Sequence, residues 1–333
     1  MKLAVVIPAY KAEYFERSLD CLARQSNTAF TVYVGDDCSP SDLKSICDRF
    51  ANRLSLRYTR FDKNIGAQHL VKQWERCMDL LGDEDWIWFF SDDDLATENC
   101  VETFFRRTAV TDGDVYRFNT CTIDGNDREV GPTVPSPDFE SSEEMALNLL
   151  LGRRGNSMPD HVFSREIYAR HGGFVHTPFA QAADWAMSIL YSKEKGMNML
   201  QEGKISWRRA GSSISSNVSR RKAATIVGHY CFIEWLLKHF TYLKIETAHA
   251  RISYDDIRNA ALKNLHDVLV FHYRGIPPVL YFRHLRFLQK HFGLTLSAAS
   301  KQLASVVISR VRHNRYERRL SQIGKMDSNA QPT

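Results

Sequence analysis

Three adjacent carboxylates, Asp92, Asp93 and Asp94, are suited to metal chemistry in this chain of 333 residues. They follow the apolar run 86–90, and neighbouring carboxylates repel one another unless a cation or solvent compensates their charge. Mg²⁺ or Mn²⁺ would take one or two of these oxygens and complete its shell with diphosphate oxygens and water. The alternative is a solvated acidic turn with a helix-capping aspartate. The position directly after a hydrophobic strand favours the metal site.

A second acidic pair, Asp36 and Asp37, closes the apolar run 30–34. A carboxylate at that point could accept hydrogen bonds from a nucleobase imide or from a ribose hydroxyl. The segment 36–42 as a whole also fits an Asx turn followed by the N-cap of the next helix. On the residues alone, both interpretations stay open.

The elements that position these carboxylates are apolar runs that alternate with stretches of helical periodicity. The pattern predicts strands at 3–7, 30–34, 54–60 and 86–90, and helices near 15–23, 43–50 and 68–81. Such alternation predicts an α/β fold: a mostly parallel sheet with helices on both faces. Sites in these sheets lie beyond the carboxyl ends of the strands, which is where both acidic groups fall.

Charge divides the chain into two parts. Residues 1–215 hold 25 Lys and Arg against 32 Asp and Glu, whereas residues 216–333 hold 19 against 7, a net charge of +12. We expect a catalytic domain over residues 1–215, with halves at 1–110 and 111–215. A basic helical extension should follow over 216–326, with a disordered tail over 327–333.

Five segments together resemble family 2 glycosyltransferases in their order and spacing. They are Val5–Tyr10, Tyr14–Gln25, Val34–Ser39, Asn64–Gly66 and Phe89–Asp94. The resemblance covers residues 1–110 and continues more loosely to residue 215. It implies a GT-A fold and an enzyme that moves a sugar from a nucleotide-sugar donor to an acceptor hydroxyl, in the assembly of a cell-surface polysaccharide.

The resemblance also implies roles for residues of the first half. The base of the donor would bind Asp37, with Asp36 beside it, and the acidic motif would hold the divalent metal and the donor diphosphate. Ser91 stands where the family commonly has its first aspartate, so Asp93 is the expected principal metal ligand, with Asp92 and Asp94 beside it. The other expected donor-binding residues are Pro8, Ala9, Tyr10, Asn64 and Gly66.

In the acceptor half, Asp184 matches the family's catalytic base, which implies an inverting transfer. Ala183 replaces the glutamate that usually precedes this acid, and an N-cap of the helix expected at 185–193 is the alternative. The segment 207–213 resembles the loop that closes on the donor phosphates, so Arg208 and Arg209 are expected at the donor. A solvated surface turn is the other interpretation of that segment.

The basic extension has two interpretations. Its apolar positions could form a surface that holds the enzyme near anionic lipid, where a lipid-linked acceptor would be found, or they could pack on the catalytic domain. The chain shows neither a signal-peptide pattern nor 18 consecutive apolar residues, and its seven cysteines form no C-x-x-C pair. We therefore expect a cytoplasmic protein, at the inner face of the membrane if the extension binds lipid.

Three rival functions were weighed against glycosyl transfer. A sugar nucleotidyltransferase would share the acidic metal site but normally needs a Gly-rich loop after the first strand, and Pro8–Lys11 contains no glycine. A catalytically inactive binding or scaffolding relative would keep the fold without turnover. A nucleic-acid binder is suggested by the basic extension alone, with no recognised nucleic-acid module, so no nucleic-acid partner is expected.

Overall fold

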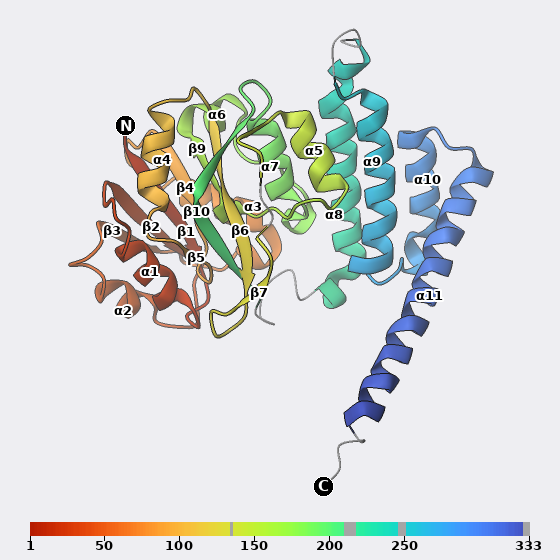
Figure 1. Ribbon diagram of the computed structural model, residues 1–333, viewed down its shortest axis with the longest axis horizontal. Helices are drawn as coiled ribbons and strands as arrows, with labels where there is room; N and C mark the ends of the chain where they lie inside the picture. Colours follow the sequence, from red (N-terminus) through yellow and green to blue (C-terminus); the bar gives the residue numbers. More distant parts are fainter. Residues whose placement is uncertain (134–135, 210–217, 246–250, 329–333) are drawn as a thin grey trace. The chain divides into compact units, whose positions relative to one another are not determined.

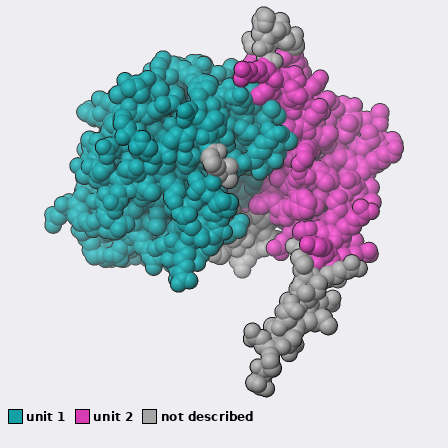
Figure 2. Space-filling model, in the orientation of Figure 1, with its two compact units in different colours: residues 1–216 teal, residues 217–333 magenta. Residues whose placement is uncertain are grey.

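The structure, a computed structural model, describes residues 1–133, 136–209, 218–245 and 251–328; of residues 218–220 and 317–328 it describes the backbone alone. The chain divides into two compact units, residues 1–216 and 217–333, coloured separately in Figure 2. This boundary lies beside the one expected at residue 215. All seven cysteines are free thiols.

The first half of unit 1 alternates strands and helices (Figure 1). In order these are β1 (Leu3–Ala9), α1 (Phe15–Ala23), β2 (Phe30–Asp36), α2 (Leu43–Asp48), β3 (Leu56–Arg60), α3 (Gly66–Met78) and β4 (Trp86–Phe89). The strands lie in the order β3-β2-β1-β4, and all three pairings are parallel. Their carboxyl ends therefore meet at one edge of the sheet, which confirms the arrangement expected from the apolar runs.

The second half of unit 1 extends the same sheet to the order β3-β2-β1-β4-β9-β6-β10-β5. Its elements are β5 (Leu95–Ala96), α4 (Cys100–Thr108), β6 (Val115–Ile123), β7 (Glu129–Gly131), β8 (Phe139–Glu140), α5 (Ser142–Leu150), η1 (Met158–Asp160), β9 (His161–Ser164), α6 (Arg165–Arg170), η2 (Pro178–Ala180), α7 (Ala183–Tyr191) and β10 (Met197–Arg208). Strands β6 and β10 are parallel, but β9 is antiparallel to both neighbours. The α/β class is confirmed, and the parallel arrangement holds for the first four strands while the sheet as a whole is mixed.

The reversed strand β9 has a consequence for the site. Because β9 runs against β4, it enters the sheet at the edge where β4 ends, and the short η1 turn that precedes it lies at that edge. An antiparallel neighbour thus brings residues near position 160 to the acidic motif, from which they are separated by about 70 residues of chain.

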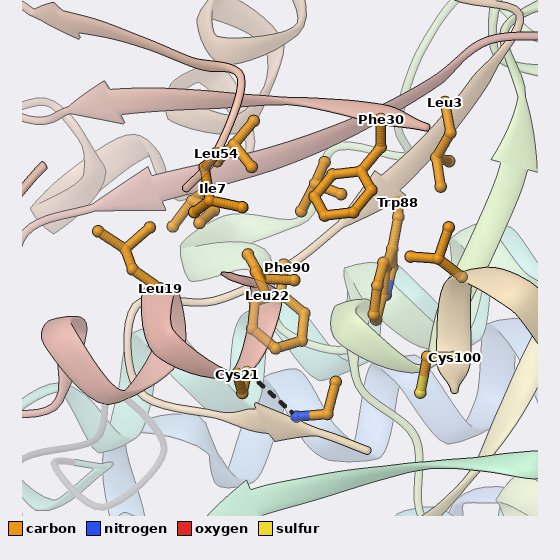
Figure 3. Close-up of a cluster of buried hydrophobic side chains, with 14 of the residues drawn as sticks. Leu3, Ile7, Leu19, Cys21, Leu22, Phe30, Leu54, Trp88, Phe90 and Cys100 are labelled. Carbon is orange, nitrogen blue, oxygen red and sulfur yellow. Dashed lines mark hydrogen bonds between the residues drawn. The ribbon is translucent and has the colours of Figure 1, made fainter. Parts of the chain in front are cut away.

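Both faces of the sheet are covered by helices, because successive strand side chains point to opposite faces. On one face, side chains from β1, β2 and β4 pack with α1, α2 and α4; Figure 3 shows ten labelled members of this cluster, among them Ile7, Leu19 and Trp88. On the other face, Phe89 and Phe163 contact Phe174, and Trp74 of α3 packs edge-on against Phe89. The core thereby fixes the strands whose ends carry the polar residues.

Unit 2 is helical. It contains α8 (Val218–His239), η4 (Phe240–Lys244), α9 (Tyr254–Asp267), the π-helical turn η5 (Val268–His272), η6 (Pro278–Leu280), α10 (Tyr281–Phe292) and α11 (Leu296–Ser328). Helix α11 extends through residues 327 and 328, the first two of the expected disordered tail; residues 329–333 lie outside the described residues. Among the described helices, none combines the length and the hydropathy that a membrane span requires.

Candidate active site

The acidic motif is tied to the end of β1 by Asp92. Its Oδ2 accepts hydrogen bonds from the backbone N–H groups of Tyr10 and Lys11, both at 2.8 Å. The residue is 8% exposed. Burial, followed by the charge of Asp93, raises the pKa of Asp92 above its usual range, and these two N–H groups oppose the shift. Asp92 therefore fixes the turn rather than facing solvent.

The other two carboxylates differ in what they contact. Asp93 is the most exposed of the three and lies 3.2 Å from Lys11 Nζ and 3.2 Å from Ser91 Oγ. Asp94 is buried, and its Oδ1 accepts the backbone N–H of Arg208 at 2.8 Å. Burial and then the charge of Asp93 raise the pKa of Asp94. Asp93 is thus the member of the motif that a ligand reaches.

A divalent cation fits this motif in charge and in donor chemistry. Burial and mutual repulsion disfavour the ionised forms of Asp92 and Asp94, and a bound cation would offset both effects. Within the described residues, however, no three His, Cys, Asp or Glu side chains gather in a geometry that would hold a metal alone. A cation here would need oxygens from another source, such as a diphosphate and water, which is how Mg²⁺ is commonly bound.

The pair at the end of β2 is held by protein donors. Asp36 is fully buried and accepts from Ser39 N at 2.7 Å, from the Tyr58 hydroxyl and from Arg60 Nη1 at 2.8 Å. Neither member caps α2, whose N-cap is Asp42. The segment 36–42 does supply the cap that the alternative interpretation expected, through Asp42, while Asp36 and Asp37 bond elsewhere.

Asp37 instead closes the start of α3. Its two oxygens accept the backbone N–H groups of Ile65 and Gly66, each at 2.9 Å, and Arg76 pairs with Oδ1. A Cβ at Gly66 would lie 2.6 Å from Asp37 Oδ2, so this contact requires glycine. The bonds bring the segments expected at the donor together, because Asp37 N also donates to Ala9 O at 2.9 Å.

Of the expected donor residues in the first half of unit 1, Tyr10 presents the most surface. It is 43% exposed, while Ala9 is buried and Pro8 is intermediate. The carbonyl of Tyr10 accepts from Ser39 Oγ at 2.6 Å, and Asn64 Oδ1 accepts from the backbone N–H that follows Gly66, at 3.2 Å. All of these residues lie at the carboxyl edge of β1 and β2 or in the loop that follows β3.

Arg208, expected at the donor phosphates, is buried inside the protein. Its guanidinium donates to the carbonyls of Asp93 and Asp124 at 2.8 and 2.9 Å, pairs with Asp127 at 2.6 Å and stacks on the Tyr14 ring at 4.2 Å. Its side chain has no exposed surface. This geometry makes Arg208 a support of the acidic motif.

Arg209, by contrast, is exposed, and its backbone N–H donates to Ile123 O at 2.8 Å. Its contact with a donor remains a prediction. Residues 210–213, the rest of the segment that resembles a closing loop, lie outside the described residues.

Asp184 lies in the first turn of α7, but it is not the N-cap, which is Ala182. The backbone before it is unusual, because Phe179, Ala180 and Ala182 all have φ between 53° and 57°. Such left-handed conformations cost energy in residues other than glycine and cluster at functional sites. Burial raises the pKa of Asp184 to about 7, opposed by a hydrogen bond from Asn156. The carboxyl group is thus poised to exchange a proton near neutral pH.

Two residues that the sequence did not single out, Asn156 and Asp160, connect the two halves of the site together with Trp207, the first residue of the segment 207–213. Trp207 Nε1 donates to Asp160 Oδ1 at 2.9 Å, and Asn156 Nδ2 donates to Asp184 Oδ2 at 3.4 Å. Asp160 is buried and raises the pKa of both Asp184 and Asp94 through its charge. Asp160 is 24 residues from Asp184, 47 from Trp207 and 66 from Asp94, so its relationship to them leaves no signature in sequence periodicity.

Comparison with protein families identifies a glycosyltransferase profile in the first half of the chain. The profile of the family described as "Glycosyl transferase family 2" matches residues 4–169. The chain is 36% identical over 70 residues to poly(ribitol-phosphate) beta-N-acetylglucosaminyltransferase TarS of Staphylococcus aureus, which is 20% of this chain and 12% of TarS. It is 24% identical over 154 residues to the glycosyltransferase GlyG of Streptococcus pneumoniae, 46% of this chain and 50% of GlyG. The matched regions thus span half or less of these relatives.

Solved structures show the same fold. The crystal structure of S. aureus TarS 1-349 in complex with UDP-GlcNAc superposes with a TM-score of 0.66 at 14% identity, covering 96% of this chain and 92% of that one. The complex of the same protein with UDP gives a TM-score of 0.54 at 16% identity. At these identities the likeness establishes the architecture, including the C-terminal helices, and not the ligand.

Proposed function

The chain belongs to glycosyltransferase family 2, and from this premise we propose that it transfers a sugar from a nucleoside-diphosphate sugar to an acceptor hydroxyl. One observation carries the proposal: a single network of contacts joins the segments that contain Asp37, Asp93 and Asp184. Bonds from Tyr10, Lys11 and Arg208 join the ends of β1, β4 and β10. The charge of Asp160, which accepts the Trp207 indole N–H, acts on both Asp94 and Asp184, so the donor-side motif and the acceptor-side base lie near one buried acid.

We propose an inverting, single-displacement mechanism. The acceptor oxygen forms a bond to the anomeric carbon while Asp184 takes the hydroxyl proton, and the bond to the diphosphate breaks with its electron pair leaving on the phosphate oxygen. With a pKa of about 7, Asp184 is ionised in a large fraction of molecules at neutral pH and is basic enough to accept a proton. No covalent intermediate between sugar and enzyme is required.

A divalent cation, Mg²⁺ or Mn²⁺, would be held by Asp93, with Asp92 and Asp94 beside it. When bound, such an ion stabilises negative charge on a departing diphosphate. The chain's own contribution is to hold Asp93 accessible while Asp92 and Asp94 are fixed by backbone N–H groups. Lys11, paired with Asp93, adds positive charge at the same place.

We propose a uridine nucleotide sugar as donor and a cell-surface polymer as acceptor. The TarS structure named above carries UDP-GlcNAc, and the name of TarS specifies a poly(ribitol-phosphate) acceptor. Calorimetric titration of the full chain with a panel of nucleoside-diphosphate sugars, with and without Mn²⁺, tests the donor. Saturable binding of one uridine sugar supports the proposal, and preferential binding of a nucleoside triphosphate would favour nucleotidyl transfer.

We further propose that unit 2 holds the enzyme at an anionic membrane surface, where a lipid-linked acceptor would be available. The supporting observation is one face of α11, called here the outer face. Its exposed apolar residues recur at helical spacing and are flanked by exposed basic residues: Ala304, Val307, Ile308 and Val311, with Lys301, Arg312 and Arg315. The opposite side of α11 packs within unit 2, where Ala299 and Val306 are fully buried.

The positive charge of this outer face favours anionic lipid over a second copy of the chain as the partner that covers it. Two copies packed face to face would bring Lys301, Arg312 and Arg315 of each chain together, and like charges would oppose that dimer. Anionic lipid complements the same charges and can accept the apolar residues between its headgroups. The cytoplasmic location expected from the sequence remains part of this proposal.

A further inference from the structure

Asn156 occupies the loop between α5 and η1 and faces the proposed base. Its Nδ2 donates to Asp184 Oδ2 at 3.4 Å, and because an ionised carboxylate can only accept, the amide nitrogen is the end that points at the ionised form of Asp184. The residue is 8% exposed. A side chain buried against a carboxyl group of raised pKa is placed to influence the behaviour of that group.

The backbone on both sides of Asn156 is held in place. Gly155 O accepts from Arg117 Nη2 at 2.8 Å, and Ser157 N donates to Asp160 Oδ2 at 3.0 Å. A Cβ at Gly155 would lie 2.9 Å from the Trp207 ring, so that ring closes over the loop. These contacts fix the backbone position of Asn156, and the burial of its side chain limits the rotamers that it can adopt.

The other end of the same amide has no hydrogen-bond partner. Oδ1 of Asn156 is buried and unpaired within the described residues. An unpaired buried oxygen costs free energy, and beside a proposed base a ligand that donates a hydrogen bond in the working state would satisfy it. The missing partner must donate a hydrogen bond, and the acceptor of a glycosyl transfer carries hydroxyl groups.

We propose that Asn156 is a positioning residue that holds the Asp184 carboxylate through Nδ2 and binds a hydroxyl of the acceptor through Oδ1. This inference rests on the proposed function, in which Asp184 is the base. One side chain would then set the distance between the base and the group that attacks. Asn156 would also favour the ionised form of Asp184, against the burial and the negative charge of Asp160 that disfavour it.

Few groups act on the pKa of Asp184, so the contribution of Asn156 to that pKa can be measured separately. Burial raises its pKa most; Asn156 and the backbone N–H of Trp185 oppose the shift, and the charge of Asp160 adds to it. Removing the Asn156 amide while Asp160 stays in place should therefore raise the pKa of Asp184 further. The acid limb of the rate profile would move to higher pH.

The test compares variants of the full chain in kcat, in KM for donor and acceptor, and in the pH profile of kcat/KM. Asn156→Ala removes both roles. The midpoint of the acid limb of the pH profile should move up by about one pH unit, as expected for losing a hydrogen bond to a charged group. KM for the acceptor should rise by about tenfold. KM for the donor should stay unchanged. Asn148→Ala is the matched control, because Asn148 donates to the Glu140 carboxylate instead.

Asn156→Asp separates the two roles and keeps the side-chain volume. It retains an oxygen for the acceptor hydroxyl but replaces the donor by a negative charge, so the acid limb should rise further than in Asn156→Ala while KM for the acceptor rises less. If Asp184→Asn is inactive but both Asn156 variants keep the wild-type acid limb and acceptor KM, the inference is overturned and the proposed function stands. If Asp184→Asn is fully active, the proposed function itself fails.

Discussion

The backbone N–H of Arg208 donates to Oδ1 of Asp94 at 2.8 Å, across 114 residues of chain. The preceding residue, Trp207, donates its indole N–H to Asp160 on the acceptor side. The end of β10 therefore holds the acidic motif through Arg208 and the acceptor loop through Trp207, the residue before it. The distance between the donor side and the acceptor side of the site is therefore set mainly by strand β10 of the sheet and only secondarily by the loops.

Arg208→Lys should lower both stability and turnover. Lysine keeps the charge but cannot reproduce the guanidinium fork that bonds the Asp93 and Asp124 carbonyls together. Loss of these bonds should reduce the free energy of unfolding by about 1–3 kcal/mol, measured by urea denaturation. Arg209→Ala is the control for stability, since Arg209 is exposed. Equal unfolding midpoints for Arg208→Lys and wild type would remove the supporting role.

Asp93→Asn should lower turnover by orders of magnitude and leave the fold intact, because it removes charge from the accessible carboxylate of the motif. EDTA should have the same effect on the wild-type enzyme, reversed by added Mn²⁺ or Mg²⁺. The control is Asp83→Asn, an exposed aspartate at the opposite end of β4. Activity that survives both EDTA and Asp93→Asn would refute the metal site.

Asp184→Asn should lower kcat by about 10²- to 10⁴-fold, the range for loss of a general base, with donor affinity unchanged. In the wild type, the rate should rise with pH and level off above the Asp184 pKa of about 7. Stopped assays between pH 5 and pH 9 measure this limb. A flat profile over that range would argue against Asp184 as the base.

The same raised pKa predicts a change in stability. Between the unfolded pKa near 3.8 and the folded value of about 7, the folded state binds more protons, so Asp184 makes stability fall as pH rises through this window. The uncharged Asp184→Asn variant should therefore melt at a higher temperature than the wild type at pH 8, with the difference shrinking toward pH 4. Identical melting curves at pH 8 would contradict the burial of this charge.

The first half of the fold was open to prediction because a parallel strand covered on both faces is a continuous apolar run, as in Leu3–Ala9 and Trp86–Phe89. Strand β6 (Val115–Ile123) lacks such a run, since it carries Arg117, which is buried and paired with Asp160. That pairing spans 43 residues and depends on the antiparallel entry of β9, which no local pattern specifies.

The site shows the same division. Asp92, Asp93 and Asp94 were predicted as site residues because they follow an apolar strand, and Asp184 was predicted through the family resemblance. The burial of Arg208 was not foreseen, because an arginine beside small residues looks the same in sequence whether it faces a phosphate or stacks on Tyr14. Asn156 belongs to no sequence motif, and its position depends on two hydrogen bonds made by its neighbours Gly155 and Ser157.

Replacing the basic residues of the α11 outer face should weaken membrane binding. The combined variant Lys301→Gln, Arg312→Gln and Arg315→Gln should bind vesicles containing anionic lipid about 100-fold more weakly in flotation assays, given about 1 kcal/mol for each basic residue near the surface. Vesicles of neutral lipid should bind neither protein.

The apolar residues of the α11 outer face are tested by a separate pair of variants and a control. Ile308→Ser and Val311→Ser should reduce flotation, whereas Val110→Ser, at a valine of unit 1 that is 74% exposed, should not. Undiminished flotation of both α11 variants would exclude this face as the membrane contact. Loss of binding to an acidic protein partner, with flotation unchanged, would identify a protein as the occupant instead.

The central claim is tested most directly by identifying the phosphorus-containing product with ³¹P NMR. The full chain is incubated with the uridine sugar that it binds, Mn²⁺ and acceptor, and Asp184→Asn serves as the parallel sample. We predict that the wild type releases nucleoside diphosphate in equal amount to the sugar gained by the acceptor, and that Asp184→Asn releases almost none. Release of pyrophosphate, or no turnover by the wild type of a donor that it binds, would contradict glycosyl transfer.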